Sequence, residues 1–159
     1  MTFEDLNLHP TLLKAVKDKN YINPTKIQEQ AIPLILKNND VLGTAQTGTG
    51  KTAAFALPIL HHLVNEKSPN GRKKIRALIV TPTRELAIQI AENFTDYSKY
   101  NDIKNTVIFG GVKQIKQVKR LEAGVDVLVA TPGRLLDLMG QGYISLKDVS
   151  YFVLDEADR

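Results

Sequence analysis

An α/β fold, in which a parallel sheet is covered by helices on both faces, is the class that this sequence predicts. Short, continuous apolar runs occur at residues 77–80, 127–130 and 151–154, as in strands that are buried within a sheet. Between these runs, apolar residues recur at the spacing of amphipathic helices. Strands that alternate with helices favour parallel pairing, and ligands then gather at the carboxyl ends of the strands.

Two helices are expected at the start of the chain. One opens near Thr11, just after His9 and Pro10, and fades by Asn20, a residue type that tolerates the left-handed conformation closing a helix. The second spans about residues 25–37, where apolar residues return at helical spacing.

The next segment predicts a strand, a loop and a helix. Val41 and Leu42 form an apolar start that we interpret as a buried strand. A helix should begin at Lys51 and bend or tighten at Pro58. Residues 67–74, which end in three adjacent basic side chains, are interpreted most simply as a solvated surface loop, with an accessory nucleic-acid contact as the alternative.

Repeated strand and helix patterns complete the chain. The run at residues 77–80 precedes a helical pattern, and a strand at residues 106–109 leads through two glycines to a basic helix. The run at residues 127–130 leads to a short helix over residues 134–139, and the last strand, residues 151–154, ends the sheet. Every candidate motif therefore lies at a strand end.

The composition indicates one globular domain. The chain has 159 residues, of which 43% are hydrophobic, enough to bury a core. It has 21 Lys and Arg against 17 Asp and Glu, and the net charge of +4 mildly favours a polyanionic partner. The lack of Cys excludes disulfides, thiolate metal sites and cysteine nucleophiles. Without a signal pattern or a membrane-length apolar run, we expect a cytoplasmic protein.

A glycine-rich stretch at the expected strand-to-helix turn predicts a phosphate-binding loop. Gly48 and Gly50 permit positive φ, so successive N–H groups can converge on an anion at the positive end of the helix dipole. Lys51 adds a mobile charge for the outer phosphates, and the Thr52 hydroxyl can ligate Mg²⁺. The pattern usually opens with Gly, where this chain has Ala45, and a flexible surface loop is the alternative. The loop comprises Ala45, Gln46, Thr47, Gly48, Thr49, Gly50, Lys51 and Thr52.

An acidic pair, Asp155 and Glu156, directly follows the last strand. An enzyme with a phosphate loop needs one carboxylate to hold Mg²⁺ and another to orient the attacking water. We assign Asp155 to the metal and Glu156 to the water. Alone, such a pair would be an ordinary turn or helix cap.

Five motifs follow one another along the chain. They are residues 45–52, residues 82–87 (Pro-Thr-Arg-Glu-Leu-Ala), Gly110-Gly111, residues 131–134 (Thr-Pro-Gly-Arg) and residues 155–158 (Asp-Glu-Ala-Asp). In this order and at these intervals they resemble the first RecA-like domain of a DEAD-box RNA helicase. Residues 97–100 and 125–137 are further similar to the bacterial RhlE-type branch of that family.

The resemblance implies a domain organisation. Residues 1–40 would be N-terminal helices with an adenine-reading Q motif, and residues 41–159 a partial RecA-like ATP-binding domain truncated after the Walker B strand. The segment with the sequence Ser-Ala-Thr and a second RecA-like domain would be absent from this chain.

The resemblance also assigns an adenine site. Gln28 would bond the adenine edge, because a carboxamide offers a donor and an acceptor together, and Tyr21 would stack on the ring. Phe3 resembles the aromatic residue of the same element. Asn20 and Lys26 stand where the family commonly has Gly and Pro. Without the resemblance, Gln28 would be an ordinary helix-surface residue.

The remaining motifs would line an RNA strand. Hydroxyls, N–H groups at helix starts and guanidinium groups bind phosphate oxygens without reading bases, so this binding would be independent of sequence. Taken singly, these motifs are ordinary helix openings and turns. The residues are Pro82, Thr83, Arg84, Gly110, Gly111, Thr131, Gly133 and Arg134.

Together, these expectations describe the ATP- and RNA-binding part of an ATP-dependent RNA helicase that uses ATP and Mg²⁺. We expect this part to be inactive by itself. A phosphate-loop kinase or other small-molecule transferase is one rival, and a non-catalytic RNA clamp is another. His9, His61 and His62 have no partners at ligand spacing, so we interpret them as surface or packing residues.

Overall fold

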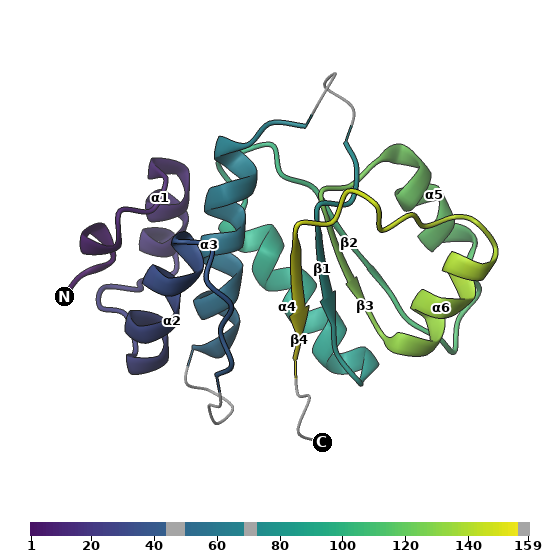
Figure 1. Cartoon of the computed structure of the whole chain (residues 1–159), viewed down its shortest axis with the longest axis horizontal. Helices are drawn as coiled ribbons and strands as arrows, with labels where there is room; N and C mark the ends of the chain where they lie inside the picture. Colours follow the sequence, from purple (N-terminus) through teal and green to yellow (C-terminus); the bar gives the residue numbers. More distant parts are fainter. Residues whose placement is uncertain (44–49, 69–72, 156–159) are drawn as a thin grey trace. The chain divides into compact units, whose positions relative to one another are not determined.

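The computed structural model describes residues 1–43, 50–68 and 73–155. The chain divides into two compact units, which are described separately: Met1–Glu66 with Asn93–Asp102, and Lys67–Glu92 with Ile103–Arg159. Figure 1 labels the elements, and helix α4 runs from the second unit into the first. The elements are η1 (Phe3–Leu6), α1 (Pro10–Asp18), α2 (Lys26–Leu36), α3 (Lys51–Asn65), β1 (Ala77–Val80), α4 (Arg84–Tyr97), β2 (Asn105–Ile108), α5 (Ile115–Ala123), β3 (Val127–Ala130), α6 (Pro132–Gly140) and β4 (Tyr151–Leu154).

The first unit is helical. Helices α1 and α2 lie close to their predicted ranges and α3 begins at the predicted Lys51, whereas the short helix η1 was not predicted. Pro10 opens α1, and Asn20 beyond its end has the predicted left-handed conformation, with φ of 61°. Thr25 and Gln28 form a capping box at the start of α2. Helix α3 contains Pro58 and is almost entirely buried over its first three turns, which places its apolar residues in the core.

The predicted strand at Val41 and Leu42 is wrong. These residues belong to no strand or helix, and their side chains are 39% and 98% exposed. Two apolar residues are a short signal, and a strand forms only where a neighbouring strand accepts its backbone hydrogen bonds. The described part of the chain offers these residues no such neighbour.

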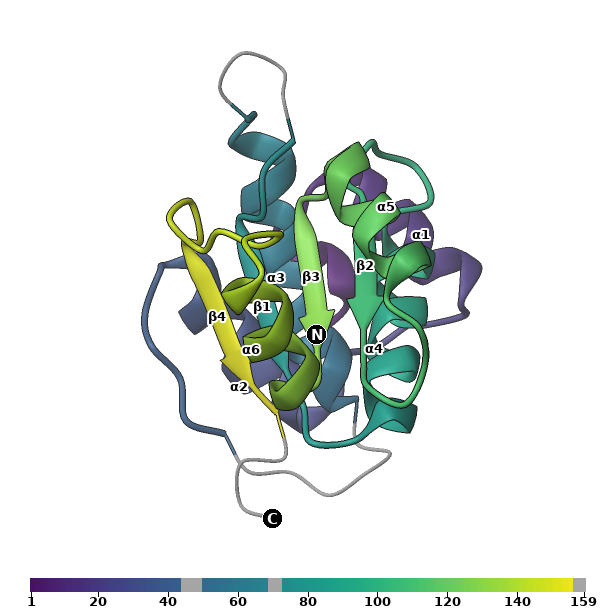
Figure 2. The same ribbon diagram turned by 90° about the vertical axis from the view of Figure 1, so that its right-hand side faces the viewer.

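The second unit is built on a parallel sheet of four strands in the order β2-β3-β1-β4. Three strands begin and end at the predicted residues, while β2 lies one residue earlier than expected, so Phe109 leaves the sheet. Val80 aligns with Ala130 of β3 and Leu154 of β4, and Ala130 aligns with Ile108 of β2. The last residues of all four strands are therefore paired in register, and Figure 2 shows β2, β3 and β4 running in the same direction.

Helices α5 and α6 pack on one face of this sheet, as Figures 1 and 2 show. Their apolar residues join alternate residues of the strands in one buried cluster, because successive strand residues point to opposite faces. The cluster contains Leu78, Val80, Ile108, Val118, Leu121, Val125, Leu128, Ala130, Leu135, Leu138 and Ile144. This packing holds α6 and the start of α5 close to the strand ends.

A buried carboxylate ties the opposite ends of the strands together. Asp126 is fully buried; its carboxylate accepts hydrogen bonds from Lys73 Nζ at 2.9 Å and from Arg76 at 3.0 Å. The backbone N–H of Lys104 donates to the same carboxylate at 2.9 Å. Asp126 thus joins the segments that lead into β1, β2 and β3.

Replacing Asp126 by Ala should lower the free energy of unfolding by about 3 kcal/mol, because it removes the buried carboxylate on which three donors converge. Asp148→Ala is the matched control, since the Lys74–Asp148 pair is 3.9 Å long and more exposed, and should cost less than about 1 kcal/mol. Denaturant titration measures both values. Equal losses in the two variants would contradict the structural role of Asp126.

Candidate functional site

A hollow lies just beyond the ends of β1, β2 and β3 in the second unit. It has a volume of about 500 Å³ and is formed by the segments that follow these three neighbouring strands. The lining residues are Pro82, Arg84, Phe109, Gly110, Thr131, Pro132, Gly133, Arg134 and Asp137. Three separate sequence motifs therefore meet in one place, as the parallel arrangement predicts.

Most of the predicted RNA residues lie in this hollow. Thr83 and Gly111 are the two that are not among its lining residues. Thr83 instead caps α4, because its Oγ1 accepts a hydrogen bond from the backbone N–H of Leu86 at 3.2 Å. Gly111 lies in the loop beside the hollow with φ of 82°, a conformation that favours glycine.

The start of α6 presents backbone donors to the hollow. The first N–H groups of a helix have no partner within the helix, and the positive end of its dipole attracts anions. Thr131, the N-cap of α6, makes no capping hydrogen bond with its side chain. A Cβ atom added at Gly133 would meet nothing within 4 Å, so the backbone here is open to a ligand.

Arg84 is the exposed cation of the hollow. Its guanidinium carbon lies 4.7 Å from the centre of the Phe109 ring, which makes a cation–π contact. Among the residues that the structure describes, this guanidinium makes no hydrogen bond or ion pair. It is therefore available to a phosphate group.

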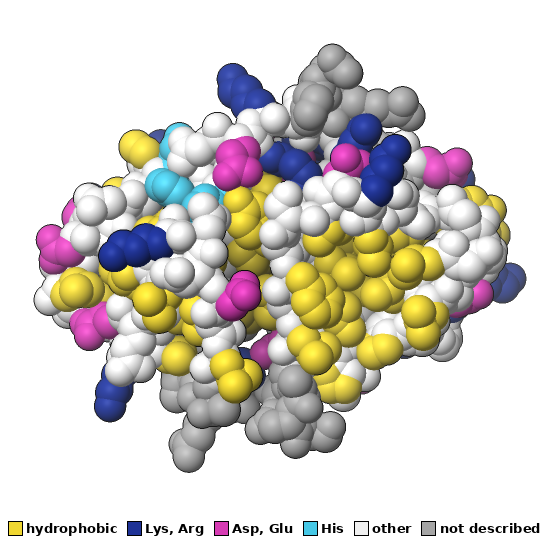
Figure 3. All heavy atoms as spheres, in the orientation of Figure 1, with side chains coloured by type: hydrophobic (Ala, Val, Ile, Leu, Met, Phe, Trp, Pro, Cys, Tyr) yellow, Lys and Arg dark blue, Asp and Glu magenta, His cyan; other side chains and the backbone are white. Residues whose placement is uncertain are grey.

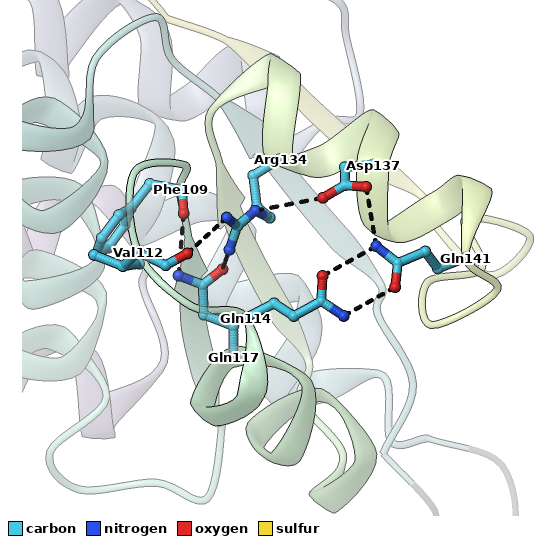
Figure 4. Close-up of polar contacts among 7 residues, drawn as sticks. All are labelled: Phe109, Val112, Gln114, Gln117, Arg134, Asp137 and Gln141. Carbon is cyan, nitrogen blue, oxygen red and sulfur yellow. Dashed lines mark hydrogen bonds and ion pairs between the residues drawn. The ribbon is translucent and has the colours of Figure 1, made fainter.

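Arg134 also borders the hollow, but its guanidinium is held within the protein (Figure 4). Its two terminal nitrogens donate to Gln117 Oε1 at 3.0 Å and to the Val112 carbonyl at 2.8 Å. Its Nε lies 3.8 Å from Asp137, and the side chain is only 11% exposed. Arg134 thus shapes the hollow, and a phosphate would have to compete for its donors.

Sequence reasoning missed three residues of the hollow. The sequence places Phe109 in a strand, and Pro132 and Asp137 carry no ligand signal of their own. Asp137 has a carboxylate that partly offsets the positive charge, and it accepts a hydrogen bond from Gln141 at 2.9 Å. Phe109 could have been found as the aromatic residue directly before the glycine pair.

The predicted adenine residues lie in the first unit. Gln28 is only 3% exposed, and its amide accepts a hydrogen bond from Thr25 N at 3.0 Å and donates one to the Gly50 carbonyl at 3.1 Å. Tyr21 stacks against Phe3, with ring centres 6.2 Å apart. Gln28 therefore connects α2 to the end of the predicted phosphate loop.

The predicted phosphate and metal residues are described only in part. Ala45, Gln46, Thr47, Gly48, Thr49 and Glu156 lie outside the described residues. Gly50 is the left-handed N-cap of α3, and Lys51 and Thr52 form the first turn of this helix in the first unit. Asp155 lies at the end of β4 in the second unit, where it is buried and its N–H donates to the Val80 carbonyl at 2.8 Å.

The histidines of the first unit pack against one another and the backbone. The His9 N–H donates to His61 Nδ1 at 2.9 Å, and His62 Nε2 lies 2.9 Å from the Ile35 carbonyl oxygen. Burial lowers the pKa of His61, and its neighbours His62 and His9 add to this effect. This arrangement agrees with the interpretation of these histidines as surface or packing residues.

Comparison with known proteins identifies the class. The profile of the DEAD/DEAH box helicase family matches residues 25–159, so the chain belongs to this family. The chain is 45% identical over 159 residues to the ATP-dependent RNA helicase DeaD of Buchnera aphidicola subsp. Acyrthosiphon pisum (strain APS), covering 99% of this chain and 26% of that protein.

Other relatives carry similar names. Identity is 45% with the ATP-dependent RNA helicase RhlB of Aliivibrio salmonicida (99% of this chain, 37% of that protein). It is 43% with the DEAD-box ATP-dependent RNA helicase CshA of Streptococcus pneumoniae (99% of this chain, 29% of that protein). The chain spans between 24% and 38% of such relatives. These names support the family and do not single out the RhlE-type branch.

Gly50 should tolerate no side chain. A Cβ atom there would lie 2.2 Å from Gln28 Nε2, and φ is 81°, so Gly50→Ala should lower the free energy of unfolding by about 2 kcal/mol or more. Gly43→Ala is the control, because its nearest contact would be Ile27 Cδ1 at 3.5 Å. Denaturant titration compares them, and a Gly50→Ala protein as stable as Gly43→Ala would contradict the observed packing around Gly50.

Proposed function

We propose that this chain is the ATP- and RNA-binding part of an ATP-dependent RNA helicase, in which ATP hydrolysis drives local duplex separation or RNA–protein remodelling. The observation that carries the proposal is the hollow at the ends of β1, β2 and β3, together with membership of the DEAD/DEAH box family. Relatives that are 45% identical to this chain are named ATP-dependent RNA helicases.

RNA phosphates are the ligand that suits this hollow. Arg84 offers an exposed guanidinium, and the start of α6 and the Gly110-Gly111 loop offer backbone N–H groups. Such groups bind phosphate oxygens without reading bases, so binding would depend on salt more than on base sequence. The other predicted contacts, from Pro82, Thr83, Thr131 and Arg134, belong to the same proposal.

ATP would bind through the residues predicted for it. Gln28 and Tyr21 would recognise adenine, the loop of residues 45–52 would surround the phosphates, and Lys51 would offset the charge that develops on the γ-phosphate. For Gln28, this requires its amide to exchange a present partner, Thr25 or Gly50, for the base.

The oxygen donors predicted for the metal have the chemistry that suits Mg²⁺. The Thr52 hydroxyl and the Asp155 carboxylate are hard oxygen ligands, which this ion prefers, and when bound it would neutralise phosphate charge. Glu156 would orient the water that attacks the γ-phosphate.

We further propose residues 1–40 as the adenine-reading part and residues 41–159 as part of a RecA-like domain in a cytoplasmic protein. Among the described residues, no helix has the length and apolar character to span a membrane.

The test is RNA-stimulated ATP hydrolysis by the whole protein. Glu156→Gln should retain ATP binding and lose activity by on the order of a hundredfold, because the amide is a poor base for the water. Lys51→Ala should instead weaken ATP binding by about tenfold or more, because it removes a charge-assisted hydrogen bond to the phosphates. Equilibrium binding and turnover are measured side by side. Hydrolysis that RNA does not stimulate would favour a phosphate-loop transferase, and equal loss of ATP affinity in both variants would contradict the assigned roles.

A further inference from the structure

We propose that Gln117 is a positioning residue for RNA binding: its buried amide fixes the loop of residues 109–112 and, through it, the donors that face the phosphate chain. This inference rests on the proposed RNA-binding function of the hollow. Gln117 is not among the residues that line the hollow, so it would act only through its neighbours.

Both ends of the Gln117 amide are hydrogen-bonded within the protein. The side chain projects from α5, and the residue is only 5% exposed. Its Nε2 donates to the Phe109 carbonyl at 3.1 Å, and its Oε1 accepts from Arg134 at 3.0 Å, as Figure 4 shows. A buried amide with both groups bonded has one favourable orientation.

The pair Gly110-Gly111 is held by hydrogen bonds on both sides. Phe109 precedes Gly110, and Val112 follows Gly111. The Phe109 carbonyl is bound by Gln117, and the Val112 carbonyl accepts from Arg134 at 2.8 Å. Because Arg134 is itself bonded to Gln117, a single connected group fixes both flanks of the pair (Figure 4).

The two glycines depend on neighbouring residues to fix their conformation. Neither has a side chain that could pack, and a Cβ atom added at Gly110 or Gly111 would meet nothing within 4 Å. Glycine also has the largest conformational freedom to lose on ordering. Hydrogen bonds to the flanking carbonyls are therefore well placed to restrict the directions of the backbone N–H groups.

The same contact extends to Arg84. The ring of Phe109 lies under the Arg84 guanidinium at 4.7 Å, and the carbonyl of the same residue is held by Gln117. Fixing Phe109 therefore fixes the surface against which the Arg84 guanidinium rests. Preorganised donors bind more tightly, because less freedom is lost when the ligand arrives.

The experiment measures the affinity of the whole protein for a fluorescent single-stranded RNA oligonucleotide over a series of KCl concentrations. Gln117→Leu removes both hydrogen bonds of the amide while filling similar space. Gln117→Glu keeps an acceptor for Arg134 but cannot donate to Phe109 at neutral pH. Gln114→Leu is the matched control, because Gln114 exchanges hydrogen bonds with Gln141 at 2.9 and 3.0 Å and has no hydrogen bond to the loop of residues 109–112 among those described.

We expect Gln117→Leu and Gln117→Glu to bind RNA about tenfold more weakly. Their log–log salt slope should fall by about 0.7 for each phosphate group that the variant no longer binds. ATP affinity and cooperative thermal unfolding should remain, and Gln114→Leu should bind RNA like the wild type. The salt slope distinguishes weaker phosphate binding from a general decrease in the amount of folded protein.

Two results would contradict the role of Gln117 while leaving the proposed RNA-binding function intact. One is RNA affinity and salt slope in folded Gln117→Leu equal to the wild type while Arg84→Ala weakens binding. The other is a loss of RNA affinity in Gln114→Leu that equals the loss in Gln117→Leu. If Gln117→Leu fails to fold, Gln117→Glu decides, and wild-type binding by that variant contradicts the role of the Phe109 hydrogen bond. If the wild type shows no salt-dependent RNA binding, or Arg84→Ala binds normally, the proposed RNA function fails and this inference with it.

Discussion

The parallel register of the sheet is the constraint on which the candidate site depends. Val80, Ala130 and Ile108 lie level across β1, β3 and β2, so the segments that leave these strands emerge side by side. Motifs that are far apart in the sequence are thereby brought to one hollow. Asp126 closes the other end of the strands, where it joins the segments entering them. The site therefore depends on the carboxyl ends of three strands together, and no single loop forms it.

The two arginines of the hollow differ in burial, and they therefore differ in what their guanidinium groups can bind. Arg84 is exposed, rests on the Phe109 ring and keeps its donors for a ligand. Arg134 is mostly buried and uses its donors to hold Gln117 and the Val112 carbonyl. Arg84 thus offers its positive charge to a ligand, whereas Arg134 holds the neighbouring side chain and backbone in place. A surface made in this way favours an extended anion and has little means of distinguishing bases.

The sequence was sufficient for elements with long or repeated signals and insufficient where the outcome depends on distant neighbours. The strands at residues 77–80, 127–130 and 151–154 were predicted at their observed bounds, because continuous apolar runs bury well in a parallel sheet. The spatial order of the strands could not be derived, and Val41 and Leu42 were wrongly assigned because burial depends on a partner strand. Gln117 carried no signal of its own, since its role arises only when α5, α6 and the glycine loop meet.

The central claim is that the three strand-end segments form one RNA-binding surface, and hydrogen exchange with and without single-stranded RNA tests it most directly. The account predicts that RNA slows exchange in residues 81–86, 109–117 and 131–137 together, to a similar extent for oligonucleotides of different sequence. High salt should abolish this protection in all three segments at once. Protection confined to other parts of the chain, or to one of these segments alone, would contradict the account.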